Sequence, residues 1–364
     1  MSHFCLLSEP EAYHPDAYDL LKDPVERGHW LDHFAGHFQQ TLKFAATQYG
    51  RTAGRAIQTA SQSFTQQIEA LRAKPDCLPG GRLDIMELCR LRERVLRANK
   101  LNDPFGYIKD RENAAASKLY PQVVRRLHAM APQARWLHLI ECVFAGNIFD
   151  LGSASTMHLA QEPTDFFAEI EETKPRPWLV DNFDRLAQDL PAAPPTKWAK
   201  AVIFVDNAGS DFILGVMPLA RELGLFGTKI VLAANELPSL NDMTVNETIS
   251  VVERLAVADA DLAVLIEAGM LEVVSSGGDT PLIDLSNVSD ELNTAAADAD
   301  LVVLEGMGRA VETNFHTPFK VDSLKLALLK DDIVAKRIGG EIYDCVCKYE
   351  PAAAAAANQE PAPS

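Results

Sequence analysis

The chain has 364 residues, of which 47% are apolar and 23% charged, as in an ordinary globular protein. Its 51 acidic and 34 basic side chains give a formal net charge of −17, which excludes a broad basic surface for nucleic acid or anionic membrane. A small phosphorylated metabolite remains a possible partner, because it needs only a local positive site. The N-terminus lacks the features of a signal peptide and no apolar run approaches the ~20 residues of a membrane span, so we expect a cytoplasmic protein. The composition leaves the oligomeric state open.

The first 190 residues are predicted to be mostly helical. Apolar residues recur at helical spacing from His29 to about Ala73, and again over 84–101, 112–130 and 134–150. His29, His33 and His37 lie four residues apart and therefore near one helical face, a spacing that can bind zinc. The aromatic residues beside them favour instead an ordinary packed amphipathic helix.

Beyond a proline-rich connector at 191–197 the pattern changes to short β-branched runs separated by helical segments. The runs are 201–205, 229–234, 271–275, 301–304 and 341–349, and the helical segments lie near 211–224, 245–258, 288–297 and 323–338. This alternation predicts an α/β fold with a mainly parallel sheet and helical crossovers over 191–350. Residues 351–364 are rich in alanine and proline, and we expect a disordered tail.

The six cysteines form no CxxC pair and no zinc-like spacing, so we expect reduced, structural thiols. Cys345 and Cys347 flank Val346 in the last β-run. Because side chains alternate along a strand, both should point to one buried face.

Polar side chains follow the first two β-runs of the α/β part. Asp206 and Asn207 come directly after the first run, and Asp242 lies in the loop after the second. The carboxyl ends of parallel strands line the crevice where ligands bind, so these oxygen donors could hold a hard divalent cation. Helix capping and an Asx turn explain the same residues without a ligand. Between them, Gly209 lies in a small-residue turn whose N–H groups could approach an anion.

Three further segments carry weaker signals. Asn147 and Asp150 lie one helical turn apart in GNIFDLGS, although a helix C-terminus accounts for them as well. The segment EGMGR, residues 305 to 309, follows a β-run and resembles a ligand loop. Lys325 could place an ammonium at the start of a helix, or could simply be solvated.

The stretch FVDNAGSDFILGVMPLARELGLFGTKIVLAANELPSLNDMT resembles the damage-control metal phosphatases, the family of the domain of unknown function eighty-nine. The similar subgroup contains plant stand-alone proteins and the C-terminal phosphatase domain of the animal pantothenate kinase-like protein. The resemblance continues through LCRLRERVLR, FAGNIFDLGS, KPRPWLVD, LVVLEGMGRAVETN, DSLKLALLK and GGEIYDCVCKYE, and so covers most of residues 80–350.

The resemblance implies a helical N-terminal part packed on an α/β domain, with one divalent metal ion between them. It also implies roles for individual residues. The metal ligands would be Asp206, Asn207 and Asp242; Asn147 and Asp150 would approach the substrate, and Lys325 would hold the phosphoryl group. Members of the subgroup resemble hydrolases of 4′-phosphopantetheine and its oxidised derivatives, and other subgroups prefer sugar phosphates.

The resulting hypothesis is a metal-dependent phosphomonoesterase. Oxygen ligands suit Mg²⁺ or Mn²⁺ and also accept Co²⁺ or Ni²⁺. Lys325 and the N–H groups near Gly209 would offset charge on the phosphoryl oxygens. Asp211 is a candidate for handling a proton or orienting water, although a carboxylate in the first turn of a helix is also favourable by itself. Asp206 could either hold the ion or attack phosphorus itself.

Two alternatives remain at this stage. A protein carboxyl methyltransferase using S-adenosylmethionine would need an acidic residue after the second strand, which Glu236 could supply, and a glycine-rich loop, which is poorly represented. A metabolite-binding regulator without turnover would keep the fold, but the intact set of Asp206, Asn207, Asp242 and Lys325 argues against it.

Overall fold

A seven-stranded sheet forms the centre of the molecule. The computed structural model describes residues 2–16, 18–78, 81–148, 166, 170 and 173–352. The strand order is β1-β7-β6-β5-β2-β3-β4, and every neighbouring pair is parallel except β6 and β7. The strands are β1 (Val180–Asp181), β2 (Lys200–Phe204), β3 (Lys229–Ala234), β4 (Leu271–Ser275), β5 (Leu301–Glu305), β6 (Asp322–Leu328) and β7 (Cys345–Glu350). The predicted α/β fold with a mainly parallel sheet is therefore confirmed.

Both faces of the sheet are buried, which explains its continuous apolar runs. In β2, Ala201 and Ile203 face one hydrophobic core, whereas Val202 and Phe204 face the other. The first core contains residues of α4 (Gly106–His128), α5 (Pro132–Ile148), α8 (Met217–Leu225), α9 (Val245–Ala258) and α10 (Ala260–Glu267). The second contains residues of α11 (Asp290–Ala296), α12 (Asp332–Arg337) and the N-terminal helices. The short α7 (Phe183–Leu186) follows β1.

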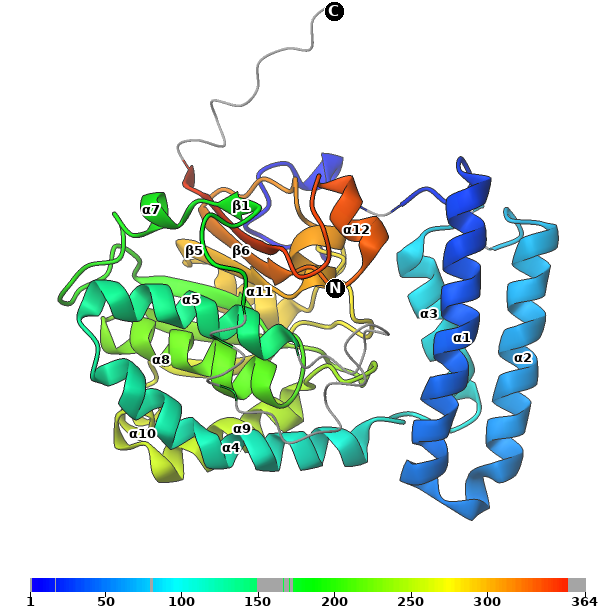
Figure 1. Cartoon of the computed structure of the whole chain (residues 1–364), viewed down its shortest axis with the longest axis horizontal. Helices are drawn as coiled ribbons and strands as arrows, with labels where there is room; N and C mark the ends of the chain where they lie inside the picture. Colours follow the sequence, from blue (N-terminus) through cyan, green and yellow to red (C-terminus); the bar gives the residue numbers. More distant parts are fainter. Residues whose placement is uncertain are drawn as a thin grey trace, which may run out of the picture.

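The N-terminal region is helical, as predicted. It contains α1 (Pro24–Tyr49), α2 (Gly54–Ala73) and α3 (Ile85–Ala98), with short turns η1 (Pro10–Ala12) and η2 (Arg51–Ala53). The first three helices stand beside the sheet, and α4 leads from them to the helical layer that contains α5 and α8 (Figure 1). The expected single helical run ending near Ala73 is two helices, because the chain turns at Gly50, whose φ of 67° favours glycine. Among the described helices, none has the length and apolarity needed to cross a membrane.

The expected helix over 323–338 is wrong in its first half. Residues 322–328 form strand β6, and α12 begins only at Asp332. All seven residues of β6 are buried, and polar and apolar residues alternate only over the short stretch 323–326. Leucine, alanine and lysine also have high helix propensity, which made this run resemble a helix. Tertiary burial decides its conformation.

The predicted arrangement of the last strand is confirmed. Cys345 and Cys347 are buried in the first core, whereas Val346 between them packs in the second. All six cysteines are free thiols. Of the expected tail, the structure describes only residues 351 and 352.

Candidate active site

Polar residues converge where β2, β3 and β5 end. Asp206 lies two residues beyond β2, Asn235 directly follows β3, and Glu305 is the last residue of β5. Because β2 lies between β5 and β3, these three strand ends are adjacent at one edge of the sheet. An isolated β-bridge between Asn207 and Asp242 joins the loops after β2 and β3. The structure therefore brings together the three predicted metal ligands Asp206, Asn207 and Asp242.

Three buried carboxylates lie next to one another in this region. Asp206, Asp211 and Glu305 each offer an oxygen atom, and these oxygens all lie within 4.8 Å of one another. Nδ2 of Asn147 donates to Oδ2 of Asp211 at 2.8 Å and to Oε1 of Glu305 at 3.1 Å. Nδ2 of Asn207 donates to Oδ2 of Asp206 at 3.0 Å and to Oδ2 of Asp211 at 2.9 Å. The two amides thus connect all three carboxylates.

Asp211 begins η4 (Asp211–Val216), a π-helical segment that continues into α8. Single π-helical turns are rare in proteins overall, but those that occur are often found at functional sites. Here the turn brings the Asp211 carboxylate back over the preceding loop, where Oδ2 accepts the backbone N–H of Asn207 at 3.2 Å. The predicted position of Asp211 at the start of a helix is confirmed; its role in catalysis stays a prediction.

Arg309 balances part of the negative charge. Its guanidinium donates to Oδ1 of Asp206 through Nη1 and to Oδ2 of Asp242 through Nη2, the latter at 2.7 Å. Arg309 belongs to η5 (Met307–Glu312), which follows the end of β5. All three side chains of this bridge are buried. The arginine therefore fixes the relative positions of two carboxylates that come from different loops.

Burial shifts the acidity of these groups. Desolvation raises the pKa of Asp206 well above its usual range, while the nearby Arg309 guanidinium opposes the shift. Desolvation also raises the pKa of Glu305 strongly, and the negative charges of Asp211 and Asp206 add to it. Burial also raises the pKa of Asp211. Burial therefore disfavours the charged forms of Asp206 and Glu305, and a cation bound near them would offset this effect.

The residues present fit a divalent cation. Among the described residues, four buried carboxylates, including that of Asp242, face the two cationic side chains of Arg309 and Lys330, a formal excess of two negative charges when all four are ionised. Three buried oxygens also accept no hydrogen bond from any residue that the structure describes. They are Oδ1 of Asn147, Oδ1 of Asp211 and Oε2 of Glu305. These oxygens lie behind the cavity wall, while the carboxylate and amide oxygens of Asp206, Asn207 and Asp242 on the wall are the kind of ligand that Mg²⁺ or Mn²⁺ prefers.

A cavity opens onto one side of this cluster. Asp206, Asn207 and Asp242 line it, together with Lys330 and Glu312. Asp211 and Glu305 lie behind this wall, buried at 2% and 1% exposure, and do not line it. Apolar side chains form much of the remaining wall: Trp30, Phe34, Ile85, Leu240, Leu282 and Met307. The cavity therefore lies between α1, α3 and the carboxyl edge of the sheet.

Lys325, expected to hold the phosphoryl group, lies elsewhere. It is in the middle of β6, where its Nζ donates to the carbonyl oxygens of Phe315 at 3.1 Å and Thr317 at 2.8 Å and to Oε2 of Glu350 at 2.9 Å. Lys325 does not line the cavity that contains Asp206. The cavity lysine is Lys330, two residues beyond the end of β6, whose Nζ donates to the carbonyl of Asn147 at 3.1 Å. The resemblance of the segment around Lys325 implied that role, whereas the lysine that lines the cavity is Lys330.

The three other predicted substrate residues, Asn147, Asp150 and Gly209, have different outcomes. Asn147 ends α5 inside the acidic cluster, whereas Asp150 lies outside the described residues. Gly209 adopts a φ of 80°, and its N–H already donates to Oδ1 of Asn113 at 2.8 Å. In this arrangement the N–H of Gly209 therefore serves the loop conformation.

Sequence reasoning missed Arg309, Glu305, Lys330 and Glu312 as site residues. Arg309 and Glu305 belong to the segment EGMGR, which by sequence is only a weak signal for a ligand loop. The stronger signal was a buried strand ending in a glutamate followed by glycine, because charged residues are rarely buried without a partner.

Burial raises the pKa of Glu312 to about 8. Desolvation lowers the pKa of His33, which lines the same cavity.

Comparison with known proteins agrees with this geometry. The damage-control phosphatase ARMT1-like domain matches residues 31–346. A damage-control phosphatase of Arabidopsis thaliana is 41% identical over 88% of this chain and 87% of its own length. The 4′-phosphopantetheine phosphatase of Mus musculus is 32% identical over 95% of this chain, which spans only 48% of that protein. A DUF89 family protein of Pyrococcus horikoshii shares the fold with a TM-score of 0.59, over 87% of this chain and 96% of that one, at 16% identity.

The fold and the acidic site define a phosphatase of the α/β type with a helical N-terminal region. This chain belongs to the damage-control phosphatase ARMT1-like family. The expectation of a phosphatase is thereby confirmed. The methyltransferase alternative is not favoured, since Glu236 is exposed and the loop after β2 carries buried carboxylates.

Proposed function

We propose that this chain is a divalent-metal-dependent phosphomonoesterase that acts on 4′-phosphopantetheine or its oxidised derivatives. The observation that carries the proposal is the buried acidic cluster, with its surplus of negative charge, at the wall of a cavity. Similarity to a 4′-phosphopantetheine phosphatase supports the choice of substrate.

We assign the metal to Asp206, Asn207 and Asp242. A cation that contacts both protein and substrate must lie on the cavity side, and these three residues line the cavity, whereas Asp211 and Glu305 do not. Arg309 would orient the carboxylates of Asp206 and Asp242, as partners behind the ligands do in metal sites. The oxygen ligands suit Mn²⁺ or Mg²⁺ and also accept Co²⁺ or Ni²⁺.

When bound, the ion would polarise the phosphoryl oxygens and lower the pKa of a water molecule. Lys330 would contribute a positive charge toward the phosphoryl group, because its buried ammonium lines the cavity beside the acidic cluster. Asp211 and Glu305 would hold Asn207 and Asn147 in place from behind. Their raised pKa values suit groups that share a proton in the metal-free state.

The wall of the cavity supports a substrate with a substantial apolar part. Phe34, Leu240, Leu282 and Met307 offer hydrocarbon surface, and Trp30 adds an indole whose buried Nε1 has no hydrogen-bond partner among the described residues. Pantetheine carries a dimethyl carbon and a thiol-ended chain that such surface can bury, whereas a sugar phosphate exposes hydroxyl groups that would lose hydrogen bonds with water. Sugar phosphates are therefore the second substrate class to test.

Phosphate release by the metal-stripped protein tests the proposal, with Mn²⁺, Mg²⁺, Co²⁺ or Ni²⁺ added back. The substrates are 4′-phosphopantetheine, its oxidised forms and several sugar phosphates. We expect turnover only with metal and a loss of at least ~100-fold in the Asp206→Asn protein. Asp298→Asn, the same exchange at an exposed surface carboxylate, is the matched control. Full metal-dependent activity in Asp206→Asn, or no release by the wild type with any ion, would overturn the proposal.

A further inference from the structure

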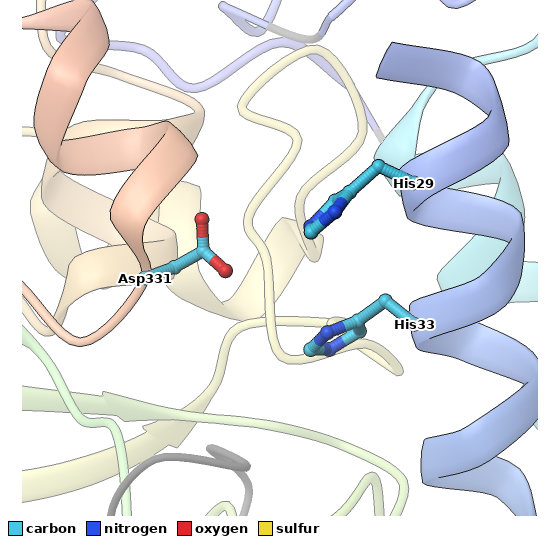
Figure 2. A group of neighbouring side chains, drawn as sticks. All are labelled: His29, His33 and Asp331. Atoms are coloured by element: carbon cyan, nitrogen blue, oxygen red, sulfur yellow. The ribbon is translucent and has the colours of Figure 1, made fainter. Parts of the chain in front are cut away.

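A second group of side chains that could hold a metal ion lies beside the cavity, whose lining includes two of its three members, His33 and Asp331. His29 and His33 project from α1 toward Asp331, which lies at the start of α12 (Figure 2). Each residue offers one ligand atom, and these atoms lie within 4.8 Å of one another. His29 is exposed and the other two are half-buried, so solvent ions can reach them. His29 and His33 are about 300 residues away from Asp331 in the chain.

The three side chains form no hydrogen bond or ion pair with one another in the part of the chain that the structure describes. Among the described residues, neither the imidazole of His29 nor that of His33 has a hydrogen-bond partner. Oδ1 of Asp331 accepts the N–H groups of Ile333 at 2.9 Å and Val334 at 3.1 Å as the N-cap of α12. These bonds fix the carboxylate and leave Oδ2 for a further ligand.

The chemistry of this group differs from that of the acidic cluster. Two imidazoles and one carboxylate are the donors that zinc sites use, with one position left for water or another ligand. Metal–ligand bonds of about 2.1 Å in a tetrahedron place neighbouring donor atoms about 3.4 Å apart. The three ligand atoms lie within 4.8 Å of one another, so they must move closer together when an ion binds.

We propose that His29, His33 and Asp331 form a second divalent-metal site, suited to Zn²⁺. The ion would join α1 to α12 beside the cavity, since His33 and Asp331 also line its wall. The two segments are already in contact there, because Arg337 of α12 pairs with Glu26 of α1 and stacks on the ring of Tyr18. The site therefore needs no rearrangement of the helices. It does not depend on the proposed phosphatase activity.

Counting bound zinc tests this site. The protein is stripped with a chelator, equilibrated with Zn²⁺ and analysed for metal content, and the binding is followed by calorimetry. An Asp206→Asn background weakens the acidic site, so that the second site is measured by itself. We expect one equivalent of Zn²⁺ and a zinc-dependent rise in Tm in this background. Both should be lost in His29→Gln/His33→Gln and in Asp331→Asn, where asparagine still caps α12.

A cobalt spectrum gives a separate measurement. Co²⁺ bound by nitrogen ligands in a four- or five-coordinate site absorbs visible light more strongly than six-coordinate Co²⁺ with oxygen ligands, so the intense bands should disappear in both ligand variants. His138→Gln is the matched control, because His138 pairs with Glu141 on α5 and lies outside the group. Equal zinc content and equal spectra in the wild type and the ligand variants would overturn the proposal. Loss of phosphatase activity in Asp206→Asn would leave it unaffected.

Discussion

Gly306 lies directly against the carboxylate of Asp206. A Cβ atom at position 306 would overlap Oδ2 of Asp206, and the φ of 94° at Gly306 is one that other residues rarely adopt. The end of β5 can therefore approach the end of β2 only because residue 306 has no side chain. This contact places Glu305 and Arg309 around Asp206.

Gly306→Ala should displace Asp206 and reduce phosphate release by at least ~100-fold, because small errors in the position of a catalytic group are costly. Gly339→Ala is the matched control, since Gly339 has a φ of 80° but no neighbour that a Cβ would touch. The control should lose only about 1–2 kcal/mol of unfolding free energy, the cost of a left-handed alanine. Equal activity losses in the two variants would show that backbone strain, and not the contact with Asp206, matters.

Substitutions of Lys330 and Lys325 should have different effects, the first mainly on activity and the second mainly on stability. Lys330→Met removes the positive charge at the cavity and should lower kcat/KM strongly with little change in fold. Lys325→Met leaves the carbonyls of Phe315 and Thr317 and the carboxylate of Glu350 without their donor, so it should reduce the unfolding free energy by about 1–3 kcal/mol. Steady-state kinetics and urea unfolding of both proteins measure the difference. The reverse pattern would restore Lys325 as the phosphate-binding residue.

Arg309 should matter most in the absence of metal. Arg309→Met leaves Asp206 and Asp242 buried without their cation, and breaking a buried pair in this way costs about 3–5 kcal/mol. Saturating Mn²⁺ should recover part of the loss, because an ion replaces the missing positive charge. Urea unfolding with and without Mn²⁺ gives both values. Arg97→Met is the control, since the pair of Arg97 with Asp279 is partly exposed and should contribute little.

Glu312 should make the metal-free protein less stable as the pH rises. Its pKa increases on folding from 4.5 to about 8, because burial disfavours the charged carboxylate. A raised folded pKa contributes stability that is complete below pH 4.5 and is lost progressively as the pH rises to about 8. Glu312→Gln, which mimics the protonated form, should therefore gain about 3 kcal/mol relative to the wild type between pH 5.5 and 8.5. Urea unfolding across this range measures the gain; a constant difference would show that Glu312 does not titrate there.

The sequence alone was sufficient for the elements whose signals are local. β-branched runs separated by helical spacing predicted β2, β3, β4, β5 and β7, and the polar residues after the first two runs predicted where Asp206, Asn207 and Asp242 would meet. Parallel strands place their carboxyl ends at the same edge, so this part of the site follows from the order of elements. The alternation in β7 likewise predicted that Cys345 and Cys347 share a face.

Only the tertiary structure decided the conformation of β6 and, with it, which lysine reaches the cavity. Strand β6 is buried on both faces and alternates over only four residues, too few to outweigh the helix propensity of its leucines, alanine and lysine, so its conformation depends on the neighbours that cover it. Glu305 and Arg309 lie in the site because the glycine at position 306 lets the ends of β2 and β5, which are about 100 residues apart in the chain, approach each other closely. His29, His33 and Asp331 come together because α1 and α12 lie next to each other, joined by the ion pair between Arg337 and Glu26, although the residues are about 300 positions apart in the chain. Such contacts depend on the folded arrangement of the chain, and no local pattern contains them.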